Sequence, residues 1–297
     1  MPTQEADGLR DRGQAPGSIG PGPVGRALGH DVTVLGVVVG GPRDRGPHLD
    51  EQVVGRAEDT LERDAVRDRD LVVQQVLAAG YGAVWLVYRT EVERGYHRGG
   101  PLTRDVRSGG EVFNRSPLEF EDKRAVVEYL AARPDIDGGR IAAVGCSHAG
   151  EMLLKLASGW DGLAAAVVAE PASHEFLALR RRSDEDVEHL QVSDAESVRR
   201  RMDLEPATAR AAAIRTPLLV MGRDGDPLQG VFRATYDLLV EVGAPVWWTT
   251  HDHPEHGYVV PERRPDGTWA DREGSLAALT GAIEFLRAHL GTGTLPA

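Results

Sequence analysis

The sequence predicts an α/β fold with a mostly parallel sheet and helices on both faces. Short apolar runs typical of buried strands alternate along the chain with longer amphipathic runs typical of helices. One apolar run leads through a tight turn directly into a helix, and no repeat of fixed period is visible. The length of 297 residues allows a single large α/β domain.

The predicted elements follow one another in a regular order. Residues 1–30, rich in Gly, Pro and charge, are expected to form an irregular N-terminal tail, and 31–297 a single domain. Apolar runs predict strands over 32–39, 83–87, 140–144, 163–169, 217–221 and 245–249. Helices are predicted over 71–79, from 116 to the residue before Pro134, around 152–157, over 228–242 and over 275–290. The polar stretch 174–210, rich in Arg and Glu, predicts a helical insertion near the edge of the sheet.

The composition limits the class of protein. The formal net charge is −12, which argues against nucleic acid as a partner because a phosphate backbone would be repelled. Cys146 is the single cysteine, so no disulfide can form within the chain. Residues 1–20 lack the apolar core of a secretory signal, and no apolar run approaches the roughly 20 residues that span a bilayer. We therefore expect a cytoplasmic protein without a membrane partner.

The turn at 145–150, Gly-Cys-Ser-His-Ala-Gly, carries the first chemical signal. It follows an apolar strand and precedes a helix, which is the context of a nucleophile elbow with Ser147 as the nucleophile. The strand and the helix pass close together beside such a turn, so the residues two before and two after the nucleophile must be small, and Gly145 and Ala149 are. Cys146 is also a nucleophilic residue type, but the residues two places from it are too large. A plain glycine-rich turn that happens to contain a serine is the alternative.

Two later strand ends supply a carboxylate and an imidazole. In this arrangement the acid and then the histidine follow the serine along the chain. The strand 217–221 is followed by Asp224 and Asp226, at the edge where open α/β sheets place their sites. We expect Asp226 to be the acid and keep Asp224 as the alternative. The strand 245–249 is followed by three histidines, of which His256, deepest in the loop and followed by Gly and an aromatic residue, is the expected base.

The other two histidines leave a metal site as an alternative. His251, Asp252 and His253, together with His256, offer the imidazoles and carboxylate that zinc binds. Their spacing is not that of a helical metal motif, and Pro254 interrupts any helix between them. We expect His251 and His253 to be structural, and no metal to be bound.

These stretches resemble the α/β-hydrolase superfamily, and within it the prolyl oligopeptidase and dienelactone-hydrolase-like branch. The resemblance covers about 32–290 and rests on Val-Gly-Gly-Pro at 39–42, Gly-Tyr-Gly at 80–82, the serine turn, and His-Gly-Tyr at 256–258. It implies an α/β-hydrolase fold with about eight strands and little or no separate cap domain. It also implies a catalytic triad of Ser147, Asp226 and His256 that needs no metal or organic cofactor. The implied oxyanion hole consists of two backbone N–H groups, those of His148 and of a residue near Gly41.

Three features depart from the pattern of this branch. Val39 stands where members often carry His or Tyr before Gly-Gly-Pro, so a side-chain contribution to the oxyanion hole is absent there. The turn between Gly222 and Asp226 has one residue more than expected, which keeps Asp224 in consideration. The 30 N-terminal residues are too few for the propeller of the peptidases in this branch, which favours an esterase-like enzyme.

The residues and the resemblance together predict a serine hydrolase with a small-molecule ester as substrate, an amide or a lactone being less favoured. The reaction would pass through an acyl-Ser147 intermediate. A binding protein without catalysis on the same fold is a second interpretation, since a fold does not fix a function. A metal-dependent hydrolase that uses the histidines at 251, 253 and 256 is the third.

Overall fold

The computed structural model describes residues 35–39, 70–86, 116–180, 194–261, 263–264 and 266–291, all within the unit Val32–Ala297. The predicted tail, residues 1–30, lies outside the described residues, so the division into a tail and one domain stays a prediction. Among the described helices, none is both long enough and apolar enough to cross a membrane.

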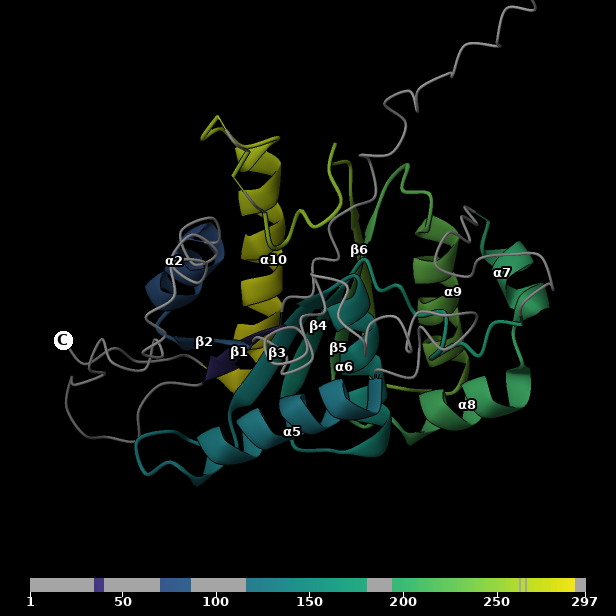
Figure 1. Cartoon of the computed structure of the whole chain (residues 1–297), viewed down its shortest axis with the longest axis horizontal. Coiled ribbons are helices and arrows are strands. Elements are labelled where there is room, and N and C mark those ends of the chain that lie inside the picture. The colour runs from purple at the N-terminus through teal and green to yellow at the C-terminus, as the bar shows by residue number, and fades with distance from the viewer. Residues whose placement is uncertain are drawn as a thin grey trace, which may run out of the picture. The chain divides into compact units, whose positions relative to one another are not determined.

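A six-stranded sheet lies at the centre of the described part of the chain (Figure 1). Its order is β2-β1-β3-β4-β5-β6. The strands are β1 (Leu35–Val39), β2 (Gly82–Leu86), β3 (Ile141–Cys146), β4 (Ala165–Ala169), β5 (Leu218–Arg223) and β6 (Val246–His251). Neighbours from β3 to β6 are parallel, while β1 is antiparallel to both β2 and β3. Because β2 then runs in the same direction as β3, the prediction of a largely parallel sheet is confirmed, and the described residues hold six of the about eight strands expected.

Helices cover both faces of this sheet (Figure 1). One face packs against α2 (Asp70–Ala78) and α10 (Arg272–Leu290). The other packs against α5 (Ser116–Ala132), α6 (His148–Gly159), α8 (Leu204–Ala213) and α9 (Gln229–Glu241). The helix α7 (Ala195–Arg201) contacts α9. This arrangement of a sheet between two helical layers confirms the predicted α/β fold class.

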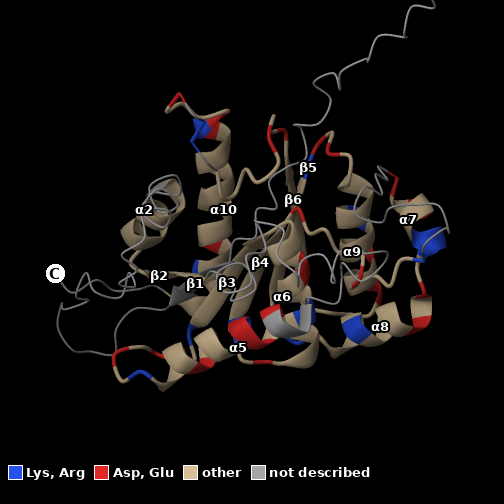
Figure 2. Cartoon of the chain, in the orientation of Figure 1, with Lys and Arg blue, Asp and Glu red and all other residues tan. Residues whose placement is uncertain are grey.

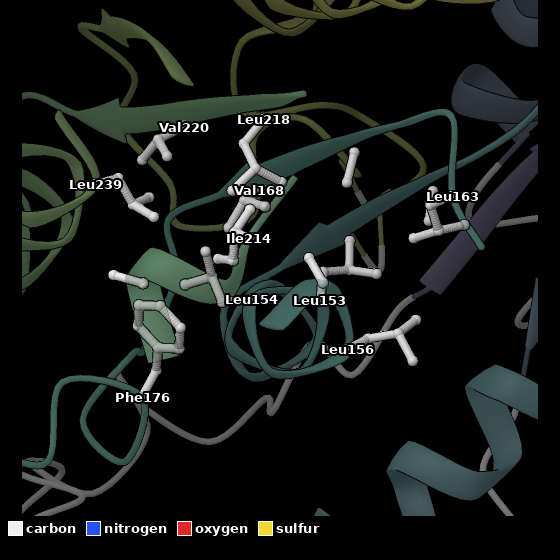
Figure 3. Packing of buried hydrophobic residues seen from close by; sticks show 14 of the residues in the cluster. Leu153, Leu154, Leu156, Leu163, Val168, Phe176, Ile214, Leu218, Val220 and Leu239 are labelled. Atoms are coloured by element: carbon white, nitrogen blue, oxygen red, sulfur yellow. The ribbon is translucent and has the colours of Figure 1, made fainter. Parts of the chain in front are cut away.

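The core explains why the strands read as continuous apolar runs. Every residue of β3 and β4 is buried, because each strand has helices on both sides. Along β3, Ala142 and Val144 face α2 and α10, whereas Ala143 faces the opposite helical layer. Figure 3 shows the second layer, where Leu153 and Leu154 of α6 pack against Val168 of β4 and its neighbours. The strands β3 and β4 carry no charged residue (Figure 2), whereas β5 ends in Arg223.

Three boundaries differ from the prediction in ways that affect the site. The strands β5 and β6 each run two residues further than predicted, since Arg223 pairs with His251 in a parallel ladder. His251 is therefore a strand residue and not a loop residue. The predicted insertion at 174–210 holds α7 and α8 in its described part, and residues 181–193 lie outside that part.

Candidate active site

Ser147 lies in a strained turn between β3 and α6. Its backbone has φ 55° and ψ −120°, a conformation that a non-glycine residue adopts at a cost of about 1–3 kcal/mol. The turn holds because β3 and α6 approach closely: a Cβ added at Gly145 would lie 2.7 Å from Ala149 O. The Ser147 N–H donates to Ala169 O of the adjacent β4 at 2.9 Å. The sequence pattern of small residues thus predicted the local geometry, with the serine held at the carboxyl end of the sheet.

His148, the predicted oxyanion donor, is the first residue of α6, so its backbone N–H lies at the positive end of the helix dipole. Its ring contacts α5, because Nε2 lies 2.5 Å from Oε2 of Glu119. Glu119 is buried on α5, and Lys123, also buried on α5, donates to Ala149 O at 3.3 Å. The helix α5 begins at Ser116. The Glu119 carboxylate thus contacts the residue that follows the serine.

The second predicted oxyanion donor, near Gly41, lies outside the described residues. Val39, the last described residue before it, pairs with Ile141 at the start of β3. Ser147 follows the other end of β3. A donor near Gly41 stays a prediction.

His256 contacts Asp226, the expected acid. Nδ1 of His256 lies 3.3 Å from Oδ2 of Asp226, and the other oxygen of Asp226 accepts the Leu228 N–H at 2.7 Å. Asp226 is buried, as a carboxylate that orients an imidazole is expected to be. Asp224 is directed elsewhere, since its Oδ1 accepts a hydrogen bond from Thr250 at 2.7 Å. The geometry therefore places Asp226, and not Asp224, beside the histidine.

A second carboxylate at this site, Glu170, was missed by the sequence reasoning. It follows β4 directly and is fully buried, and its Oε1 lies 3.1 Å from Nδ1 of His256. The signal that located Asp226, an acidic residue just after a buried strand, applies equally to Glu170.

His256 lies near Cys146, the residue that precedes Ser147. The ring nitrogen of His256, a carboxylate oxygen of Glu170 and Sγ of Cys146 lie within 4.8 Å of one another. Since Cys146 precedes the serine, this places the imidazole at the end of β3.

The other two histidines, His251 and His253, contact other groups of the protein. His253 is buried, and its Nε2 lies 3.2 Å from both Asp271 O and Ser275 Oγ, while its Nδ1 accepts the Glu255 N–H at 3.1 Å. The ring of His251 packs beside Tyr258, 5.3 Å between centroids. In the described part of the chain, these two histidines do not gather with His256 into a metal site.

A different group of possible metal ligands does meet, namely Cys146, Glu170 and His256. Its donor atoms already have protein partners: Oε2 of Glu170 accepts the Gly257 N–H at 2.6 Å, and Sγ of Cys146 lies 3.6 Å from the same oxygen. Burial and the charge of Glu170 raise the pKa of the Cys146 thiol well above its usual value. A protonated thiol is neither a good metal ligand nor a nucleophile, which agrees with the assignment of Ser147 over Cys146.

The carboxylates dominate the electrostatics of the base. Burial alone would lower the pKa of His256, but hydrogen bonds and charge from Asp226 and Glu170 outweigh it and raise the pKa to about 9. Burial pushes the pKa of Asp226 upward, and the His256 hydrogen bond, the Leu228 N–H and Arg223 together bring it below its usual value. The lowered pKa of Asp226 and the raised pKa of His256 both favour the ion pair between this carboxylate and the imidazolium at neutral pH.

A largely parallel sheet flanked by helices, with a strained serine between a central strand and the following helix, defines the α/β-hydrolase fold. No protein-family model and no curated protein matches the sequence. Among solved structures, an esterase from Pyrobaculum calidifontis is 16% identical, with a TM-score of 0.46, over 75% of this chain and 71% of its own.

Two longer proteins are similar to a smaller extent. Dipeptidyl peptidase 4 of Porphyromonas gingivalis is 17% identical, with a TM-score of 0.41, over 59% of this chain and 23% of its own. A puromycin hydrolase is 18% identical, with a TM-score of 0.41, over 60% of this chain and 26% of its own. This chain therefore matches only about a quarter of the length of these two proteins.

Proposed function

We propose that the protein is a serine hydrolase that cleaves the ester bond of a small molecule through an acyl-Ser147 intermediate. Two observations support the proposal: the strained backbone of Ser147 between β3 and α6, and Nδ1 of His256 3.3 Å from the buried carboxylate of Asp226. A non-glycine residue at positive φ costs stability, and such strain is found chiefly at functional sites.

The proposed reaction uses these residues in two steps. Neutral His256 takes the proton of the Ser147 hydroxyl as its oxygen attacks the ester carbonyl, and the protonated ring then gives that proton to the departing alcohol. The N–H of His148, at the start of α6, supports the negative charge that develops on the carbonyl oxygen. Water, deprotonated by the same imidazole, then releases the acid from Ser147.

A fluorophosphonate probe tests this function directly, because it reacts with an activated serine and not with an ordinary one. The wild-type protein should be labelled and the label should map to Ser147, whereas Ser147→Ala should remain unlabelled with an unchanged melting temperature. Turnover of p-nitrophenyl acetate and of a matched anilide then separates ester from amide preference.

Three outcomes would change the proposal. Absence of labelling in folded wild-type protein would favour a binding protein on the same fold. Loss of turnover on chelation, restored by zinc, would favour a metal-dependent hydrolase. Faster turnover of the anilide than of the ester would replace the substrate class.

A further inference from the structure

Both carboxylate oxygens of the buried residue Glu170 have partners in the protein. Its Oε1 lies 3.0 Å from Nε of Arg223 and 3.1 Å from Nδ1 of His256. Its Oε2 accepts the Gly257 N–H at 2.6 Å and lies 3.6 Å from Sγ of Cys146. Glu170 therefore touches both the histidine and the backbone of the residue that follows it.

The backbone of Glu170 is also unusual. Its φ is 44°, in the left-handed region that glutamate rarely adopts. Its N–H donates to Met221 O of β5 at 2.7 Å, directly beside the Ser147 N–H bond to Ala169 O on the neighbouring strand. The strained residue thus lies at the carboxyl edge of the sheet, next to the serine turn.

Arg223 joins this glutamate to the expected acid. Its Nε contacts Glu170, its Nη2 contacts Asp226, and its Nη1 donates to His253 O at 3.3 Å. One guanidinium therefore holds two buried carboxylates around a single imidazole nitrogen. Nδ1 lies at nearly equal distances from them, 3.1 Å to Glu170 and 3.3 Å to Asp226.

The charges in this cluster do not balance while the imidazole is neutral. Two carboxylates and one guanidinium leave one negative charge in a buried place, and a protonated His256 cancels it. The titratable groups that lie near the ring are Asp226 after β5, Glu170 after β4 and Cys146 in β3. Arg223 of β5 contacts both carboxylates.

We propose that Glu170 is a positioning residue of the base, which shares the Nδ1–H of His256 with Asp226, so that either carboxylate alone can hold the ring in its working tautomer. The inference rests on the proposed role of His256 as general base. The proposed arrangement differs from a triad because two carboxylates, Asp226 and Glu170, take the place of one acid. Arg223 contacts both of them.

Two single variants and their combination test this sharing. In a hydrolase with one acid, its replacement by the amide lowers kcat by about 10⁴ because the wrong tautomer is favoured. Here Asp226→Asn and Glu170→Gln should each keep more than about a hundredth of the wild-type kcat, and the double variant should fall by about 10⁴. If Asp226→Asn alone were as inactive as the double variant, Glu170 would have no share and the inference would be overturned.

The pH dependence supplies a readout that a merely structural role would not move. Removing one of two negative neighbours lowers the pKa of an imidazole by about one unit, so the midpoint of kcat/KM against pH should move down by about that amount in Glu170→Gln. Glu151→Gln is the matched control, since Glu151 is equally buried but accepts from the Glu175 and Phe176 N–H groups, away from the histidine. Its pH midpoint should stay that of the wild type.

A direct titration separates failure of this inference from failure of the proposed function. The ring protons of His256 can be followed by NMR in the Ser147→Ala background, where no turnover is needed. A lower His256 pKa in Glu170→Gln, absent in Glu151→Gln, supports the shared proton even if no ester is hydrolysed. An unshifted pKa contradicts it even if the wild type is active. Should Glu170→Gln fail to fold, the residual kcat of Asp226→Asn decides alone.

Discussion

The close approach of β3 and α6 at the serine turn can be tested by adding one methyl group at Gly145. A Cβ there would lie 2.7 Å from Ala149 O, 2.8 Å from Ala149 C and 2.9 Å from Cδ1 of Leu153. Two of these atoms are helix backbone, so the methyl group fits only if the first turn of α6 moves. Overpacking of this kind costs about 1–3 kcal/mol, and each kcal/mol lowers the melting temperature of a chain this long by about 2–4 °C. We therefore expect Gly145→Ala to lower Tm by about 2–12 °C.

The same displacement should slow the chemistry. A shift of about 1 Å in a reacting group can cost about 10²-fold in rate, so fluorophosphonate labelling of Ser147 should slow by about that factor. Gly281→Ala is the control, because Gly281 is exposed in α10 and its added Cβ meets nothing within 4 Å. That variant should gain about 0.5–1 kcal/mol from helix propensity. If Gly145→Ala melts and labels like the wild type, the tight turn deduced from these distances is wrong.

The remaining predictions concern the base and the thiol. His256→Ala should lower ester turnover as much as Ser147→Ala, since members of a triad act as a unit, whereas His253→Ala should mainly lower Tm because both of its ring nitrogens bond to the protein. The value of kcat/KM should rise as the pH increases toward about 9, because His256 accepts a proton only when it is neutral and its pKa is raised to about 9. A profile that is already level near neutral pH would contradict this. Iodoacetamide should leave the folded enzyme active, since burial raises the pKa of Cys146, and rapid loss of activity together with modification of Cys146 would argue against this placement.

Local rules predicted the serine turn well. The small residues Gly145 and Ala149 report a contact between a strand and the helix that follows it, and both partners are near in sequence. The parallel ladder from β3 to β6 then fixes where the later strands end, and this brings the Asp226 loop and the His256 loop to the same edge. The order of the strands along the chain was therefore enough to predict that Asp226 and His256 follow strands of the same sheet as Ser147.

Contacts between distant side chains were harder to predict. Glu119 is 29 residues from His148, and Glu170 is 53 residues from Arg223. The sequence separation of the two residues predicts neither contact, because each contact depends on how helices and strands pack. The burial of Glu170 could not be predicted either, since a glutamate after a strand is usually solvated, and only its partners make burial tolerable.

The two carboxylates that position His256 also oppose its use as a base at neutral pH. With a pKa of about 9, only about one imidazole in a hundred is neutral at pH 7. The carboxylates stabilise the imidazolium that forms when Ser147 is deprotonated, but they stabilise the resting imidazolium equally, and that proton must leave first. Replacing Glu170 should therefore have opposite effects at the two ends of the pH range. At alkaline pH the loss of a partner for Nδ1–H lowers kcat, whereas near neutral pH the larger neutral fraction offsets part of that loss. The ratio of Glu170→Gln to wild-type activity should thus increase as the pH falls from about 9 to about 7, and a ratio that stays constant would mean that the charge of Glu170 does not reach the base.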